Sequence, residues 1–260
     1  MNQPKTQTDR YVLRLKSAYQ PKLSIVLPTY NRLKYLKLCI PTILGQSFTD
    51  FELIIVNDGS TDGTEAYIKS LRDSRIIYVR WANKGEYAAT NAGWRLAKGQ
   101  YLTWIHSDDT WPKDTLKKRI GTLEKNPEID FTHGNIEHVD EDGKSREKVT
   151  AFDGAAKTAF LEYLKPIDER IMPYLIHYPS IMIRRDFLTR TGFLDETLPC
   201  SGDFDWLLRA LRLGKTLKTP GFHYYYRSHL AQRSKAERKD FSRRPVDELI
   251  YSRYRKYLPQ

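Results

Sequence analysis

Two adjacent aspartates, Asp108 and Asp109, follow an apolar stretch in the middle of the chain. Residues 101–105 read Tyr-Leu-Thr-Trp-Ile, which is typical of a buried strand. In open α/β folds ligands bind at the carboxyl ends of the strands, so this pair would stand at a binding edge. Mg²⁺ and Mn²⁺ prefer sites where one or two carboxylates act together with substrate phosphates. The alternative is that one aspartate caps a helix that Pro112 begins.

Polar residues also follow two other predicted strands, over 23–27 and 51–56. Pro28 ends the first strand and residues 29–31 follow it, while Asp58 comes just after the second. Because parallel strands point their carboxyl ends the same way, these clusters are expected at one sheet edge. The Asp58 carboxylate can accept hydrogen bonds from a base N–H or a ribose hydroxyl, and the backbone near Pro28 would line the same pocket. The alternative for Asp58 is a turn residue bonded to its own backbone.

The spacing of apolar residues predicts alternating strands and helices in the first 110 residues. We expect strands over 23–27, 51–56, 76–79 and 101–105, with helices over 32–44, after 62 and over 86–97. This alternation indicates βαβ units and a mostly parallel sheet. Asn31 is expected to cap the first helix, and Pro41 to kink it or begin a second segment. Asp62 and Glu65 form a plausible capping box for the second helix.

The second half of the chain has a mixed pattern. We expect a helix over 114–125, strands within 130–149 that turn at Asp142-Gly143, a helix over 155–165, a strand over 180–183 and a helix over 203–213. The first half therefore resembles a nucleotide-binding unit, and the second an acceptor-binding unit that shares its sheet.

Composition favours a soluble globular protein. The 260 residues are 40% hydrophobic and 29% charged, and no apolar run approaches the ~18 residues of a membrane span. The N-terminus has no signal-peptide pattern, and Cys39 and Cys200 lie far apart. We expect a cytoplasmic protein without disulfides.

The net charge of +11 is concentrated near the C-terminus, where residues 227–260 hold ten Lys and Arg against four Asp and Glu. A basic segment with interspersed tyrosines could contact nucleic acid, anionic lipid or a phosphorylated substrate. The alternative is a solvated helix with basic faces.

Several motifs together resemble glycosyltransferase family 2. They are the stretches 23–32, 56–64, 83–85, 88–93, 192–196, 202–209 and 226–229, and the pair Asp108-Asp109. Each motif alone is weak, but their order and spacing are specific, and they cover about residues 22–232. The matched region is expected to be a catalytic domain over 22–232 with halves 22–110 and 111–232. The polar residues 1–21 before it, which end at Pro21, are expected to form a flexible arm with one short helix, and residues 233–260 a basic tail.

The resemblance implies a GT-A type α/β fold, in which helices flank a Rossmann-like, mostly parallel central sheet and the second half is mixed. It also implies a nucleotide-sugar donor, Mg²⁺ or Mn²⁺, and inversion at the anomeric carbon. Asp203 matches the catalytic base, Asp58 the contact to the base of the nucleotide, and Asp109 the direct metal ligand. The other matched or proposed binding residues are Pro28, Thr29, Tyr30, Arg32, Lys84, Asp108 and Arg227 for the nucleotide-sugar, and His229 for the metal.

Some positions admit other roles. Thr90 stands where the family often has Arg, which leaves neutralisation of the diphosphate to Lys84, Arg32 or Arg227. Asp203 could instead cap its own helix. His106 is expected to pack at the strand end. Trp104, Trp111 and Trp206 are expected in the core or in a wall, and Trp111 is the best of the three for the alternative role of a sugar-stacking platform.

The resulting hypothesis is an inverting, metal-dependent glycosyltransferase. It would move a sugar from a UDP-sugar to a hydroxyl of a saccharide or lipid-linked saccharide in the synthesis of polysaccharide, lipopolysaccharide or glycan. The basic tail could hold it at the inner, anionic face of the cell membrane. The alternatives are a sugar-phosphate nucleotidyltransferase, which would need a Gly-rich loop after the first strand, and a nucleic-acid-binding protein, for which no motif is present.

Overall fold

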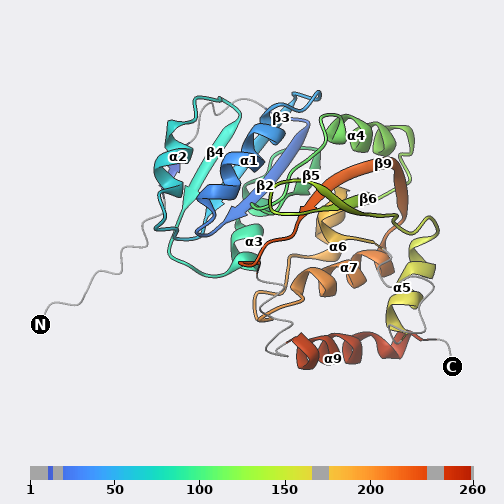
Figure 1. Cartoon of the computed structure of the whole chain (residues 1–260). Coiled ribbons are helices and arrows are strands. Elements are labelled where there is room, and N and C mark those ends of the chain that lie inside the picture. Colours follow the sequence, from blue (N-terminus) through green and yellow to red (C-terminus); the bar gives the residue numbers. More distant parts are fainter. Residues whose placement is uncertain (1–10, 14–19, 166–175, 233–242, 259–260) are drawn as a thin grey trace, which may run out of the picture.

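One mixed sheet organises the molecule (Figure 1). The computed structural model describes residues 11–13, 20–165, 176–232 and 243–258. The strands of this part are β1 (Tyr11–Leu13), β2 (Leu23–Thr29), β3 (Phe51–Asn57), β4 (Ile76–Arg80), β5 (Tyr101–Trp104), β6 (Phe131–Val139), β7 (Ser145–Val149), β8 (Met182–Arg184) and β9 (Thr216–Arg227). Their order is β1-β4-β3-β2-β5-β8-β6-β7, and β9 pairs with β6.

The four strands of the first half are parallel, as predicted. The chain crosses from β2 to β3 and β4 on one side and then returns to β5 on the other side of β2. This reversal creates a crevice beyond the carboxyl ends of β2 and β5, where open α/β sheets bind ligands. β8 pairs antiparallel with both β5 and β6, so the second half extends the same sheet.

Helices cover both faces of the sheet. They are α1 (Leu33–Leu44), α2 (Thr64–Ser70), α3 (Glu86–Leu96), α4 (Thr115–Lys125), α5 (Ala156–Leu164), α6 (Phe187–Thr191), α7 (Gly202–Leu213) and α9 (Arg243–Tyr254), with a 3₁₀ turn η2 (Tyr178–Ser180). Alternate residues of β2 point to opposite faces: Ile25 packs in the cluster that includes α1 and α4, and Val26 in the cluster that includes α3, α5, α7 and α9.

The capping of the first two helices differs from the prediction. Asn31 does not cap α1; it has a φ of 50°, and its Oδ1 accepts a hydrogen bond from the Thr61 N–H at 2.8 Å. The α1 N-terminus is held instead by Asp62, whose Oδ2 accepts from the Leu33 N–H at 2.9 Å. The predicted capping box was wrong, because Gly63 is the N-cap of α2 and the Asp62 carboxylate is shared: its Oδ1 accepts from the Thr64 N–H at 3.2 Å while its Oδ2 serves α1.

Two prolines are accommodated inside elements. α1 continues through Pro41 to Leu44 without a second segment, and β2 continues through Pro28 to Thr29. The remaining predicted elements of the two halves are present, with ends shifted by a few residues, and the 130–149 hairpin turns at Gly143, which has a φ of 87°.

The ends of the chain carry structure that the sequence did not predict. Within the arm predicted over 1–21, β1 pairs antiparallel with β4, while residues 1–10 and 14–19 lie outside the described residues. In the basic tail predicted over 233–260, residues 233–242 also lie outside them. The following α9 packs on the body through buried Val246, Ile250 and Tyr254, so it is neither a free tail nor a fully solvated helix.

Close packing of α3 on β2 depends on Gly93. A Cβ at this position would come within 2.3 Å of Val26 Cγ1. Gly121 lies inside α4, and a Cβ there would meet nothing within 4 Å. Gly93→Ala is therefore expected to lower the free energy of unfolding by about 1–3 kcal/mol through overpacking. Gly121→Ala should raise it by about 0.5–1 kcal/mol because alanine favours the helix.

Urea denaturation of the two variants beside the wild type measures both effects. Equal stability of the Gly93→Ala protein and the wild type would contradict the close approach of α3 to β2.

Candidate active site

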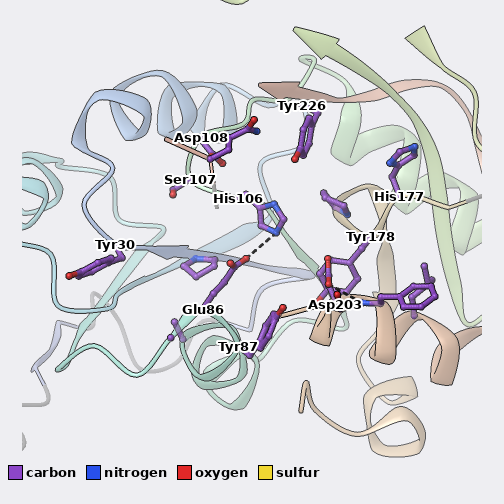
Figure 2. Close-up of a pocket in the computed structure, with 18 of the residues that line it drawn as sticks. Tyr30, Glu86, Tyr87, His106, Ser107, Asp108, His177, Tyr178, Asp203 and Tyr226 are labelled. Carbon is purple, nitrogen blue, oxygen red and sulfur yellow. Dashed lines mark hydrogen bonds and ion pairs between the residues drawn. The ribbon is translucent and has the colours of Figure 1, made fainter. Parts of the chain in front are cut away.

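A cavity of about 1050 Å³ lies beyond the carboxyl ends of β2, β3 and β5 and extends toward α7. Figure 2 shows Tyr30 on one side, Asp108 with His106 and Glu86 in the middle, and Asp203 beside Tyr178 toward the other side. The cavity thus joins residues from both halves of the chain.

The end of the cavity next to β2 and β3, here called the strand-edge end, contains most of the predicted nucleotide-binding residues. Its lining includes Pro28, Thr29, Tyr30, Arg32 and Asp58. The Tyr30 side chain is 46% exposed, so a planar group could stack on it. Arg32 Nη2 donates to the Ala231 carbonyl at 2.8 Å, which links the start of α1 to the loop after β9.

Asp58 organises the loop before α3. Its Oδ1 accepts hydrogen bonds from Trp81 Nε1 at 2.8 Å and from the Lys84 N–H at 2.9 Å, and its Oδ2 accepts from the Gly85 N–H at 2.9 Å. Burial raises the pKa of Asp58, and these hydrogen bonds oppose the rise. Asp58 bonds a loop far along the chain rather than its own turn. Lys84 does not line the cavity; its Nζ lies 5.6 Å from the centre of the Trp81 ring.

The two central aspartates have different surroundings. Asp109 is 1% exposed, and its carboxylate accepts from Tyr224 Oη at 2.6 Å and from the Arg227 N–H at 2.7 Å. Burial and the neighbouring charge of Asp108 raise the pKa of Asp109 to about 8. Asp108 lines the cavity, and its Oδ2 lies 3.0 Å from His229 Nε2.

The surroundings of Asp108 favour its charged form. Burial acts to raise its pKa, but the hydrogen bond with His229 and the nearby His106 outweigh burial and lower the pKa below its ordinary value. Neither aspartate caps a helix, because α4 begins only at Thr115, after Asp114. The capping alternative is therefore excluded.

The end of β9 and the loop after it contact the aspartate pair through Arg227 and His229. Arg227 Nε donates to the Asp108 carbonyl at 3.1 Å and Arg227 Nη1 to the Glu141 carbonyl at 2.7 Å. The His229 ring stacks on Tyr35, with ring centres 4.2 Å apart. Arg227, His229 and Asp109 are absent from the described lining of the cavity, so all three support Asp108 from outside it.

The donor set at this place suits a hard divalent cation only in part. In the described residues no three His, Cys, Asp or Glu side chains gather into a metal site. A carboxylate at the cavity wall beside an imidazole nevertheless fits an ion whose other ligands are water and substrate phosphates, as Mg²⁺ requires.

Asp203 stands at the N-terminus of α7, on the cavity wall. Its Oδ1 accepts from the N–H of Phe204 at 2.9 Å, and the helix dipole favours its negative charge. The preceding Ser201 has a left-handed φ of 56°, a strained conformation that often marks functional sites. Gly202 packs on Tyr87 and donates its N–H to Tyr87 Oη at 3.0 Å, which fixes the start of α7 against α3. Asp205 points away from the cavity and pairs with Arg209 and Arg253.

The structure adds residues to the site that sequence reasoning missed. His106 lines the cavity instead of only packing at the strand end, and its Nε2 lies 3.3 Å from Glu86 Oε1 (Figure 2). Glu86 is the first residue of α3 and gave no sequence signal. The position of His106, two residues before the aspartate pair, was a signal that could have been used.

The far end of the cavity is aromatic. Tyr163, Tyr178, Phe204, Tyr226 and Tyr251 line it. Trp111 is not part of this wall: it is 3% exposed and packs in the core near Arg119, which fits the core role and not the stacking alternative.

The family model for Glycosyl transferase family 2 matches residues 24–192. This match covers more than half of the chain, and the protein therefore belongs to glycosyltransferase family 2. It is a glycosyltransferase, as the sequence motifs predicted.

Curated relatives carry the same assignment. An uncharacterized glycosyltransferase of Haemophilus influenzae is 34% identical over 168 residues, which are 64% of this chain and 66% of that protein. TuaG of Bacillus subtilis, a putative teichuronic acid biosynthesis glycosyltransferase, is 29% identical over 195 residues, which are 71% of this chain and 76% of TuaG. An uncharacterized glycosyltransferase of Rickettsia bellii is 30% identical over 211 residues, and the chain spans 28% of that relative's length.

Solved structures confirm the fold class. Staphylococcus aureus TarS 1–349 in complex with UDP-GlcNAc superposes with a TM-score of 0.68 at 20% identity. The match covers 83% of this chain and 61% of the TarS 1–349 chain. The mannosyltransferase PcManGT from Pyrobaculum calidifontis in complex with GDP-Man and Mn²⁺ gives a TM-score of 0.56 at 18% identity, and that match covers 88% of this chain and 62% of the PcManGT chain. The fold is the GT-A type, with a mostly parallel central sheet flanked by helices.

Asp58→Asn tests the support of the loop before α3. The amide nitrogen that replaces one carboxylate oxygen cannot accept, so at least one of the three donors now shared by the two oxygens loses its partner. We expect the free energy of unfolding to fall by about 1–3 kcal/mol. Amide hydrogen exchange at Lys84 and Gly85 should also accelerate.

The matched control is Asp153→Asn, which removes an exposed carboxylate that pairs with Lys218 at 3.5 Å. If the Asp58→Asn protein kept wild-type stability and exchange rates, the loop would not depend on this carboxylate.

Proposed function

We propose that this enzyme transfers a sugar from a UDP-sugar to an acceptor hydroxyl, with inversion at the anomeric carbon. The observation that carries the proposal is the position of Asp203, which shares one cavity with Asp58 and Asp108 from the other half of the chain. A donor whose nucleotide lies at the strand-edge end would place its anomeric carbon between Asp108 and Asp203.

Asp203 acts in this proposal as the catalytic base. An acceptor hydroxyl is a poor nucleophile until a base removes its proton during attack, and a positioned carboxylate contributes ~10²–10⁴-fold to such a step. The nucleotide leaves from the opposite face, as in inverting glycoside hydrolysis, so one displacement inverts the configuration.

Mg²⁺ or Mn²⁺ would be held by Asp108, with His229 beside it, and by the diphosphate of the donor. Asp109 was expected to be the direct ligand, but its hydrogen bonds with Tyr224 and Arg227 favour a supporting role. When bound, the ion would stabilise the negative charge that develops on the leaving group. Arg32 is the candidate at the cavity wall for a further phosphate contact.

The strand-edge end is proposed to bind the nucleotide. Tyr30 offers a surface for the base, and Asp58 with the backbone of Pro28 and Thr29 offers acceptors for its N–H groups. TarS, which has this fold, binds UDP-GlcNAc and UDP, and these complexes support a uridine donor.

The aromatic end is proposed to bind a saccharide acceptor, alone or lipid-linked, because tyrosine rings offer apolar faces together with polar hydroxyls. The description of TuaG supports a place in cell-envelope polysaccharide synthesis. The nucleotidyltransferase and nucleic-acid-binding alternatives receive no support from the family or the fold.

Contact with an anionic membrane stays a prediction. Arg255 and Lys256 follow α9 near exposed Tyr257 and Leu258, a combination that suits a lipid surface. Location at the cytoplasmic face also stays a prediction, and no helix in the described residues has the length and apolarity of a bilayer span.

Asp203→Asn tests the proposed base. The substitution keeps the size of the side chain but removes proton acceptance, so transfer should fall by about 10²–10⁴-fold. Binding of UDP, measured by calorimetry with Mn²⁺, should stay within about twofold of the wild type, because UDP does not reach Asp203.

The control for this variant is Asp186→Asn, which removes an exposed carboxylate outside the cavity lining. Loss of transfer together with loss of UDP binding would show instead that Asp203 maintains the structure.

Asp108→Asn tests the proposed metal site. UDP binding in the presence of Mn²⁺ should weaken by about tenfold or more, since a carboxylate ligand is lost, whereas binding in excess chelator should stay nearly unchanged. Calorimetric titration under both conditions separates the two effects. An unchanged titration with Mn²⁺ would remove Asp108 from the metal site.

A further inference from the structure

The pair formed by Glu86 and His106 occupies the middle of the cavity. Figure 2 shows it between Asp108 on one side and Asp203 on the other, with the contact of 3.3 Å between His106 Nε2 and Glu86 Oε1 drawn as a dashed line. If the diphosphate lies at Asp108 and the base is Asp203, the sugar ring that joins them must pass this pair.

Backbone contacts fix both members of the pair. Glu86 begins α3 directly after Gly85, which has a left-handed φ of 93° and donates its N–H to Asp58 Oδ2. His106 follows β5, and its N–H donates to Tyr224 Oη at 3.2 Å. The carboxylate of Glu86 is therefore presented to the cavity from a rigid position.

The surroundings of the pair are acidic. Glu86, Asp108 and Asp203 line the cavity together with His106, and His106 Nδ1 lies 3.8 Å from Asp109 Oδ2. In the described lining of the cavity Arg32 is the one Lys or Arg, and it lies at the strand-edge end. A carboxylate on the sugar ring would meet like charge here, whereas sugar hydroxyls would find an acceptor.

We infer that Glu86, positioned by His106, binds hydroxyl groups of the donor sugar and discriminates against donors whose sugar carries a carboxylate. The donor class is then an uncharged hexose or N-acetylhexosamine, and uronic acids are rejected. The inference rests on the proposed function, because it takes the sugar of a nucleotide-sugar as the group that crosses the centre of the cavity.

Calorimetric Kd values for three ligands with Mn²⁺ test the selectivity: UDP, UDP-glucose and UDP-glucuronate. The wild type should bind UDP-glucuronate about tenfold more weakly than UDP-glucose, as expected for like charges a few ångströms apart. Glu86→Gln should remove most of this ratio by improving UDP-glucuronate binding, and should leave the Kd for UDP unchanged. The matched control, Glu124→Gln, removes a surface carboxylate paired with Lys22 and should keep the wild-type ratio.

His106 is a positioning residue in this inference, and two variants test it. His106→Leu removes the polar contact of 3.3 Å with Glu86, so KM for UDP-glucose in donor hydrolysis should rise about tenfold while kcat changes little. His106→Gln keeps an N–H donor near the same place and should restore most of the affinity. The Kd for UDP should not change in either variant.

The outcomes separate the two proposals. Failure of all three UDP ligands to bind the wild type would overturn the proposed function and this inference with it. Binding of UDP and both sugars with equal Kd values, or an unchanged ratio in Glu86→Gln, would overturn the inference alone. Equal loss of affinity in His106→Leu and His106→Gln would overturn the positioning role.

Discussion

Repulsion between carboxylates is the constraint on which the structure of this site depends. Glu86, Asp108 and Asp203 line one cavity from both halves of the chain, and Asp109 lies next to Asp108 but outside that lining. Like charges this close raise the pKa of a buried member unless another group compensates. Burial and Asp108 raise the pKa of Asp109, whereas the hydrogen bond with His229 helps to lower the pKa of Asp108. His106 Nε2 lies 3.3 Å from Glu86 Oε1, and Asp203 stands apart at the N-terminus of α7.

These compensations tie the site to the framework around it. Tyr224 lies on β9 and bonds both Asp109 and the N–H of His106, so one hydroxyl connects the last strand to the end of β5. Asp58 similarly connects the end of β3 to the loop that starts α3. Because each bond joins distant segments, the site forms only when the sheet is complete.

The directions of several side chains depend on contacts with distant segments. Asp62 had the spacing of a capping residue for its own helix, yet its carboxylate is shared between the Thr64 N–H of α2 and the Leu33 N–H of α1. Trp111 follows the aspartate pair closely, and its side chain packs in the core. Asp109 matched the family's metal ligand, while Asp108 is the member of the pair that lines the cavity. In each case the local sequence determined which strand or helix end carries the residue, while contacts with distant segments decided the direction of its side chain.

The sequence by itself determined the parallel strands, because continuous apolar runs bury on both faces, and it determined which strand ends carry Asp58, Asp108 and their neighbours. The motif order also determined the family. Tertiary structure alone decided that Glu86 and His106 meet at the centre and that α9 closes one face of the core. Periodicity and spacing act over a few residues, whereas these contacts join groups separated by tens of positions whose approach depends on the packing of the whole sheet.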